Sequence, residues 1–326
     1  MRQPASSRCS ITAWHRVLLP RPKPLMRKRH VELTTHSRHG WLDKFNSKLV
    51  WVTSDQALIT NPMILCADDY GLRGDINRAI LDLSGSGRLS AVSCMVAFEQ
   101  CTAAVLSELL AYQDRVDIGL HLCLTHEPPD LGSPPGGNRG PASFPPYAEL
   151  VRRALTRRVQ RRDVARQVSA QYELFVEKCG RRPDHIDGHL YVHQLPGVRA
   201  GLLDFLSSLP AGSRPYVRNT RLALRDLWRW RLPWVKSAFI GAFGNWMSHR
   251  LRALGVPTNT GFAGIYDFRD WNRYPEYFPR FVLCLEHANG LLVVHPGQDE
   301  DWRRQELAVL GKFPFPPGRL YRFQRS

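Results

Sequence analysis

The chain has 326 residues, of which 43% are hydrophobic and 23% are charged, with 24 glycines and 24 prolines. These proportions exclude a collagen-like, low-complexity or mostly disordered chain. No apolar run approaches the roughly 18 residues of a membrane span, so we do not expect an integral membrane protein. Half of the net charge of +16 lies in residues 1–60. The remainder lacks the basic stripe with interleaved aromatics of a nucleic-acid-binding module, and we expect no nucleic-acid partner.

Residues 1–60 predict a basic, poorly ordered or loosely attached extension, and residues 61–326 predict the globular domain. The extension has no acidic residue before Glu32 and no apolar core of a secretory signal, although it loosely resembles an organelle transit peptide. An upstream start that translation does not use is the other interpretation of this segment.

The seven cysteines are odd in number and contain no CxxC pair. This pattern argues against a disulfide framework or a cysteine-rich zinc site and favours a reducing, cytoplasmic compartment. Four of the cysteines interrupt apolar stretches and are expected to be small buried hydrophobes, namely Cys66, Cys94, Cys123 and Cys284.

Short β-like runs alternate with helical patterns from residue 62 onward, which predicts a parallel α/β fold. Strands are expected at 62–67, 88–96, 116–122, 184–187, 216–218 and 291–294, with a further unit beginning at 262–268. Helices are expected at 76–85, 100–112, 162–179, 197–209 and 275–288. About seven strand–helix units predict a distorted or incomplete (β/α) barrel.

Two segments break this rhythm. Residues 127–146 are rich in Pro and Gly and predict a long surface loop, of the kind that serves as a lid or binding loop or is disordered. Residues 221–255 are rich in Trp and Arg. They are either a helical excursion packed on the body or an interfacial helix at a membrane surface.

Polar side chains follow four of the predicted strands, where parallel α/β folds bind their ligands. The strand ends carry Asp68 and Asp69, His121, the run His185 to His193, and His295. Two adjacent carboxylates repel each other unless a cation or a proton compensates, although an Asp pair after a strand also commonly caps the next helix. One Asp with two or three neutral imidazoles suits a hydrolytic divalent ion.

The histidines at 185, 189 and 193 are four residues apart, which is also the spacing of one helix face. Gly188 within the run and Pro196 after it favour a strand followed by a loop at the rim of the barrel.

These motifs occur in the order seen in the YdjC-like carbohydrate deacetylases, a family that includes the ChbG chitooligosaccharide deacetylases and the hopanoid-associated HpnK proteins, and the chain resembles them from about residue 62 to its end. The matching motifs are CADDYGL at 66–72 with Asn77, Ser93 and Met95, GLHL at 119–122, HIDGH at 185–189 with His193, and VHPG at 294–297. The resemblance implies a distorted (β/α) barrel.

The resemblance also implies a role for each matching residue. Asp69, His121 and His189 would bind one divalent ion, Mg²⁺ or Zn²⁺. Asp68 would be the general base, and we propose His295 as the general acid. The expected substrate contacts are His193, Tyr70 and Arg218, although a structural ion pair is an equal alternative for Arg218.

The chain departs from the family pattern at two positions. Tyr191 stands where the family commonly has a histidine, and Gly188 stands where it commonly has a serine. Both changes bear on substrate contacts more than on metal binding.

The expected function is removal of N-acetyl groups from an amino sugar or a chitooligosaccharide. The same site acting on another amide or ester, or on a lipid-linked acetylated sugar at a membrane surface, is the first alternative. A non-enzymatic sugar-binding protein is the second, although pure binding needs no base such as Asp68. The expected partner is a small carbohydrate, and the residues leave oligomeric state and sugar length open.

Overall fold

The computed structural model describes residues 62–125, 145–222, 228–229, 234–285 and 289–323. The expected extension at 1–60, most of the expected loop at 127–146 and part of the Trp/Arg-rich segment lie outside these ranges. The division of the chain into an extension and a domain therefore stays a prediction.

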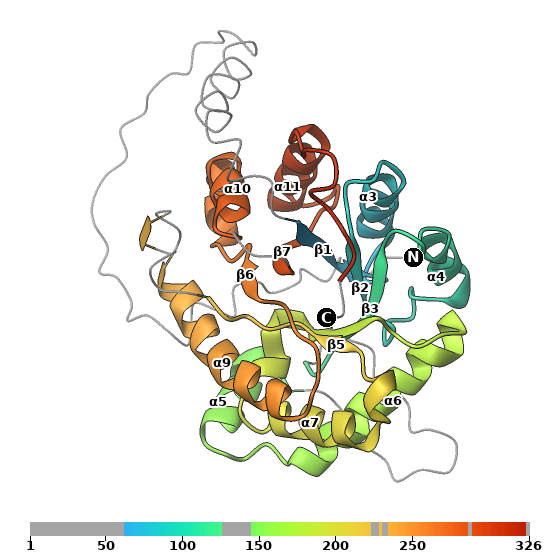
Figure 1. Ribbon diagram of the computed structural model, residues 1–326, viewed down its shortest axis with the longest axis vertical. Helices are drawn as coiled ribbons and strands as arrows, with labels where there is room; N and C mark the ends of the chain where they lie inside the picture. Colours follow the sequence, from blue (N-terminus) through green and yellow to red (C-terminus); the bar gives the residue numbers. More distant parts are fainter. Residues whose placement is uncertain (1–61, 126–144, 223–227, 230–233, 286–288, 324–326) are drawn as a thin grey trace, which may run out of the picture.

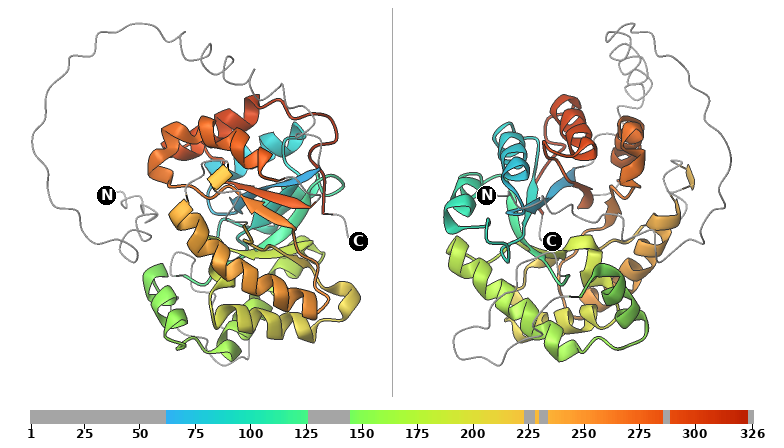
Figure 2. Two further views of the ribbon diagram at one scale, coloured as in Figure 1. Left: turned by 60° about the vertical axis from the view of Figure 1, so that its left-hand side comes forward. Right: turned by 180° about the vertical axis from the view of Figure 1, so that it is seen from behind.

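Seven parallel strands form one sheet in the order β5-β4-β3-β2-β1-β7-β6. The strands are β1 (Met63–Tyr70), β2 (Ala91–Cys94), β3 (Asp117–Leu122), β4 (His185–Gly188), β5 (Tyr216–Val217), β6 (Gly261–Ala263) and β7 (Gly290–Val294). The sheet curls into an incomplete barrel with helices around its outside (Figures 1 and 2). This architecture confirms the predicted distorted (β/α) barrel.

The gap between the edge strands β5 and β6 is crossed by the segment that leads into β6. The backbone N–H of Val217 donates to the carbonyl of Pro257 at 2.9 Å, and Val217 also forms a β-bridge with Thr258. The side chain of Asn259 binds the backbone of Asn219 from the same segment. Within the described residues, these contacts partly close the barrel without an eighth strand.

Eight α-helices are described around the sheet. They are α3 (Gly74–Gly85), α4 (Ala103–Leu110), α5 (Tyr147–Leu155), α6 (Arg161–Cys179), α7 (Val198–Ser208), α9 (Trp234–Ala253), α10 (Tyr274–Leu283) and α11 (Asp301–Lys312). Short 3₁₀ segments lie between them, at η3 (His189–Gln194), η4 (Ala211–Ser213) and η5 (Phe268–Arg273). In the described part of the chain, no helix combines the length and the apolar character that crossing a membrane requires.

The elements follow from their apolar patterns. Ile76, Ile80 and Leu83 bury one face of α3 at helical spacing, as predicted. All eight residues of β1 are buried, because this central strand has neighbours on both edges and side chains packed on both faces. Helix α6 ends at Gly180, whose left-handed backbone conformation, with φ of 66°, provides the expected stop.

Two helices were not predicted. Helix α5 follows the Pro/Gly-rich segment and has an arginine-rich outer face. Helix α11 buries Arg303 and Glu306 beside Trp302, Val309 and Leu310. A helix is recognised in a sequence by apolar residues at helical spacing. Because two of the five buried residues of α11 are ionisable, this apolar pattern is interrupted and the helix was missed.

Candidate functional site

Two adjacent aspartates reach the same face of the sheet because β1 carries a bulge at its carboxyl end. The register of β1 against β2 shifts between Ala67 and Tyr70, and Asp69 has a left-handed backbone with φ of 71°. A bulge interrupts the alternation of side chains between the two faces of a strand. Both carboxylates therefore approach Nε2 of His121, with Asp68 Oδ2 at 3.9 Å and Asp69 Oδ1 at 3.5 Å.

Asp69, His121 and His189 form a compact group that could hold a metal ion. Oδ1 of Asp69 lies 3.5 Å from Nε2 of His121 and 3.2 Å from Nδ1 of His189. Two ligand atoms held about 2.1 Å from a tetrahedral ion are roughly 3.4 Å apart. All three side chains are buried, and three protein ligands is the number that leaves a catalytic zinc one open position. The residues present therefore fit one divalent ion.

The carboxylate of Asp69 is held in its ionised form. Nη2 of Arg303 donates to its Oδ2 at 2.6 Å, which leaves Oδ1 facing the two histidines. Burial alone raises the pKa of Asp69, but the charge of Arg303 and the hydrogen bonds from His121 and His189 together hold it well below its ordinary value. Asp69 is thus a charged carboxylate at neutral pH and a candidate ligand.

The ring of His121 is oriented by Asp187 on the neighbouring strand. The two residues are register partners of β3 and β4, and Nδ1 of His121 lies 2.6 Å from Oδ1 of Asp187. Burial lowers the pKa of His121, but Asp68, Asp187 and a hydrogen bond to Asp69 raise it to about 10. Nδ1 is therefore occupied, while Nε2 points into an anionic environment that favours a cation.

Arg218 directly follows β5 and binds Asp68 with both of its terminal nitrogens. Nη1 donates to Oδ2 at 2.6 Å and Nη2 to Oδ1 at 2.5 Å, and Arg218 is fully buried. This bidentate pairing fixes the plane of the carboxylate. Because a carboxylate has about four lone-pair sites, the two hydrogen bonds from Arg218 leave further acceptor sites on Asp68.

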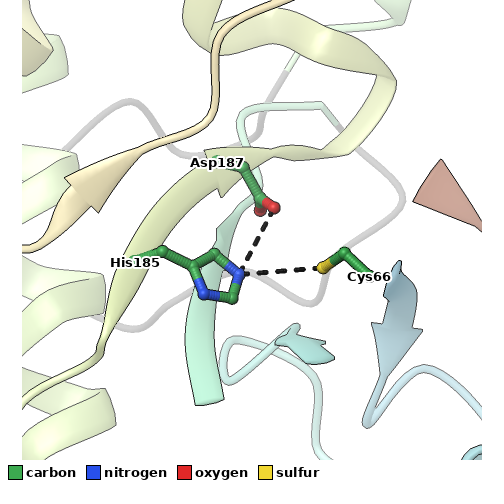
Figure 3. A group of neighbouring side chains, drawn as sticks. All are labelled: Cys66, His185 and Asp187. Carbon is green, nitrogen blue, oxygen red and sulfur yellow. Dashed lines mark hydrogen bonds and ion pairs between the residues drawn. The ribbon is translucent and has the colours of Figure 1, made fainter. Parts of the chain in front are cut away.

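A second group with ligand-like spacing consists of Cys66, His185 and Asp187 (Figure 3). Nε2 of His185 lies 3.6 Å from Oδ2 of Asp187 and 4.0 Å from Sγ of Cys66. Nη2 of Arg218, however, lies 2.5 Å from Oδ2 of Asp187 and 3.1 Å from Sγ of Cys66. A guanidinium therefore already provides the positive charge at this group.

The electrostatics of the second group agree with this reading. Burial raises the pKa of the Cys66 thiol, although Arg218 lowers it. Burial also lowers the pKa of His185. A neutral thiol and a neutral imidazole beside a guanidinium form a structural network, which Ser93 completes by donating to Asp187 at 2.6 Å.

Two glycines make room for buried histidines. A Cβ on Gly119 would lie 2.2 Å from Nε2 of His185, and a Cβ on Gly188 would lie 2.9 Å from Nδ1 of His193. Contacts this short cannot be accommodated without movement of the rings. The close packing at Gly188 gives a physical reason for the glycine at this departure from the family pattern.

His295 follows β7 and faces Asp68 from another strand end. Its Nε2 lies 3.9 Å from Oδ2 of Asp68, and its side chain is 13% exposed. The rings of Phe268 and Trp302 meet the imidazole edge to face, with centroid distances of 5.4 and 5.9 Å. The structure thus brings five predicted site residues together, namely Asp68, Asp69, His121, His189 and His295.

The three predicted substrate contacts lie in protein contacts instead. The hydroxyl of Tyr70 donates to the carbonyl of Val105 at 2.6 Å, and Nε2 of His193 lies 3.0 Å from the carbonyl oxygen of Arg218. The guanidinium of Arg218 binds carboxylates, as the ion-pair alternative proposed. Contact of these three residues with a substrate stays a prediction.

The sequence reasoning gave no role to Asp187, Arg303 or Glu306. Asp187 stands two residues after His185 and therefore faces the same side of β4, a signal that strand alternation contains. Arg303 and Glu306 lie on α11, three residues apart and on one face of that helix. Recognising them requires α11 to be recognised first.

Comparisons with known proteins identify relatives of this chain. The chain is 30% identical over 136 residues to the chitooligosaccharide deacetylases of Yersinia pestis (strain Pestoides F) and Yersinia pseudotuberculosis serotype O:1b (strain IP 31758), which is 42% of this chain and 52% of each relative. The aligned region thus spans about half the length of these curated relatives.

The fold is similar to that of a protein of Enterococcus faecalis V583 whose proposed role is cellobiose-phosphate cleavage. The TM-score is 0.53 at 17% identity, and the match covers 78% of this chain and 91% of that chain. Residues 62–315 match the model of the YdjC-like protein family, a range that includes every site residue described above. The chain therefore belongs to the YdjC-like protein family.

Proposed function

We propose that the protein is a metal-dependent hydrolase that removes an N-acetyl group from an amino sugar or chitooligosaccharide. The observation that carries this proposal is the pairing of a ligand group with a separate carboxylate. Asp69, His121 and His189 have ligand spacing, while Asp68 stands 3.9 Å from His121 and is held by Arg218. A binding protein needs the ligand group but has no use for a second oriented carboxylate.

Asp69, His121 and His189 would hold the ion. The chemistry that a bound divalent ion supplies is polarisation of the acetyl carbonyl and a lower pKa for water. Two imidazoles and one carboxylate suit zinc, whereas magnesium prefers oxygen ligands, so both ions belong in the test.

Asp68 is the proposed general base. It takes a proton from the attacking water while the new bond forms between the water oxygen and the acetyl carbon. Arg218 fixes the direction of the Asp68 carboxylate, so that the base does not rotate away as it becomes protonated.

His295 is the proposed general acid. Breaking the carbon–nitrogen bond releases an amine, and this leaving nitrogen takes a proton from Nε2 of the His295 imidazolium. The products are acetate and the free amino sugar. In each turnover Asp68 gains one proton from water and His295 loses one proton to the amine. Transfer of one proton from Asp68 to His295 therefore restores both groups to their starting state.

The names of the Yersinia relatives support a chitooligosaccharide-type substrate. Because the alignment spans about half of their length, the sugar class is part of the proposal. A small carbohydrate is therefore the proposed partner, and a cytoplasmic location stays a prediction.

Release of acetate from N-acetylglucosamine oligomers tests the proposal. The purified protein should release acetate, lose this activity after treatment with a chelator, and regain it when Zn²⁺ or Mg²⁺ is added back. Activity that survives complete metal removal would contradict the metal-dependent mechanism. Absence of acetate release with every sugar and either ion would contradict the deacetylase function.

A further inference from the structure

We propose that Glu306 is a positioning residue that holds Nδ1 of His295, so that Nε2 is directed toward the leaving nitrogen. This inference rests on the proposed deacetylase function, because it gives His295 the role of general acid. Glu306 belongs to α11, one of the two helices that the sequence pattern did not reveal.

Two side chains on one face of helix α11 form hydrogen bonds with the backbone of His295. Oε2 of Glu306 accepts the backbone N–H of His295 at 2.5 Å, and Nη1 of Arg303 donates to its carbonyl oxygen at 3.3 Å. Arg303 also binds Asp69. The position of His295 is therefore set by the helix that also orients a candidate metal ligand.

The imidazole of His295 lies between two carboxylates. Its Nε2 is 3.9 Å from Oδ2 of Asp68, and its Nδ1 is 3.9 Å from Oε1 of Glu306. Within the described residues, Nδ1 is buried without a hydrogen-bond partner. Catalytic hydrogen bonds are often long in a substrate-free enzyme and shorten in the complex. Glu306 is the carboxylate placed to accept this N–H.

Glu306 is itself fixed. Its side chain is 1% exposed, and its Oε1 accepts the hydroxyl of Tyr266 at 2.7 Å. A buried carboxylate is costly unless donors satisfy it, and an N–H on Nδ1 of His295 adds such a donor. Phe268 and Trp302 contact the imidazole edge to face, which limits its rotation. The arrangement favours a single ring orientation.

In this arrangement the two ring nitrogens of His295 have different roles. With Nδ1–H directed at Glu306, the proton on Nε2 is the one that passes to the departing amine as the carbon–nitrogen bond breaks. The imidazolium becomes a neutral imidazole that keeps its proton on Nδ1. Glu306 neither gains nor loses a proton and does not contact the substrate.

The test compares two substrates that differ in their need for an acid. The variant Glu306→Gln should lose about 10- to 100-fold in turnover of an N-acetylglucosamine oligomer. Hydrolysis of 4-nitrophenyl acetate should change less than about 3-fold, because its leaving group departs without a proton. The ester rate of Asp68→Asn is subtracted as background. Asp301→Asn, the same chemical change at an exposed position of α11, is the matched control and should leave both rates unchanged.

A double variant separates positioning from a structural role. In a His295→Ala background, Glu306→Gln should cause no further loss with the amide, because Glu306 acts through a ring that is no longer present. Equal losses with amide and ester, or a full additional loss in the His295→Ala background, would overturn the inference. If Glu306→Gln does not fold, Glu306→Asp keeps the charge but withdraws the carboxylate, and the same selective loss with the amide is expected.

Nitrogen NMR of histidine-labelled protein tests the positioning without any turnover. Neutral His295 should carry its proton on Nδ1 in the wild type and distribute it over both nitrogens in Glu306→Gln. An Nε2–H tautomer in the wild type would overturn the inference. An Nδ1–H tautomer that depends on Glu306, in a protein that releases no acetate, would instead refute the proposed function and leave the positioning in place.

Discussion

His121 and His185 are fully buried imidazoles on neighbouring strands, and both lie beside Asp187, yet their affinities for a proton move in opposite directions. Burial lowers the pKa of each, but Asp68 and Asp187 reverse this at His121 and raise its pKa to about 10. At His185 burial prevails, and Arg218 adds to the lowering. The first imidazole faces three carboxylates, which outnumber the two guanidiniums that bind them. The second faces one carboxylate, Asp187, which already binds Arg218.

This difference decides which of three candidate groups can hold an ion. The third group consists of Asp68, His121 and Asp187, and both of its carboxylates already bind Arg218. The group of Asp69, His121 and His189 and the group of Cys66, His185 and Asp187 both have ligand atoms within 4.8 Å of one another. Spacing alone therefore does not separate them. The charge of the neighbouring side chains does, because a cation is stabilised only where carboxylates exceed the cations already present.

The largest expected effect follows from removing the guanidinium of the second group. Arg218→Met leaves Asp68 and Asp187 buried without their common cation, and the free energy of unfolding should fall by about 3–5 kcal/mol. Urea denaturation measures this loss. Arg166→Met, which breaks an exposed pair with Asp163, is the control and should cost less than about 1 kcal/mol. A loss at Arg218 as small as that of the control would contradict the charge-balance account.

The next effect concerns the base. Asp68→Asn should reduce amide turnover by about 100-fold or more while the metal content is unchanged, because the proposed ligands are Asp69, His121 and His189. Asp68 does not cap the following helix, because α3 has Arg73 at its N-cap and no side-chain cap. If Asp68 serves only as the buried partner of Arg218, the variant should instead lose thermal stability and keep nearly normal turnover. Both quantities are measured on one preparation.

The next prediction concerns the buried imidazole of His193, which should remain unprotonated in the folded protein. Burial lowers the pKa of His193 from 6.5 to about 4. Its contribution to stability is therefore complete above pH 6.5 and is lost as the pH falls toward 4, since the unfolded chain binds the proton more readily. Between pH 7 and pH 5, His193 should account for about 2 kcal/mol of lost stability. The variant His193→Gln should lose correspondingly less over this interval, and an unchanged pH dependence would argue against a neutral buried His193.

The smallest effect sharpens the role of the residue that both groups share. Asp187→Asn keeps a side chain of the same size beside His121 but removes the charge, and metal affinity should fall by about 10- to 100-fold. Calorimetric titration with Zn²⁺ measures this change. Ser93→Ala, which removes only a donor to Asp187, should have a weaker effect in the same direction. An unchanged affinity in Asp187→Asn would show that the ring of His121 is oriented by other contacts.

The strand-end half of the site could be predicted from the sequence, and the helix-borne half could not. Asp68, Asp69, His121 and His295 directly follow or end apolar runs, and parallel strands bring such ends to one rim. The bulge that turns Asp68 and Asp69 to the same face depends on the left-handed backbone of Asp69, which the residue type alone does not reveal.

The helix-borne residues depend on long-range packing. Arg303 and Glu306 reach the site from α11, whose buried face contains charged residues because those charges serve the site. Arg218 likewise binds two distant residues, Asp68 about 150 positions and Asp187 about 30 positions before it in the sequence. Neither partner can therefore be inferred from the local sequence. Pairing of buried charges across the barrel is a property of the fold.

The metal content of three proteins shows which of the two groups holds the ion. The wild type and two variants, Asp69→Asn and Cys66→Ser, are loaded with Zn²⁺ or Mg²⁺, freed of unbound ions and analysed for metal per chain. We expect one equivalent of ion in the wild type and in Cys66→Ser, and close to none in Asp69→Asn. Loss of the ion in Cys66→Ser with full occupancy in Asp69→Asn would place the metal at the group beside Arg218 and contradict a metal site at Asp69, His121 and His189.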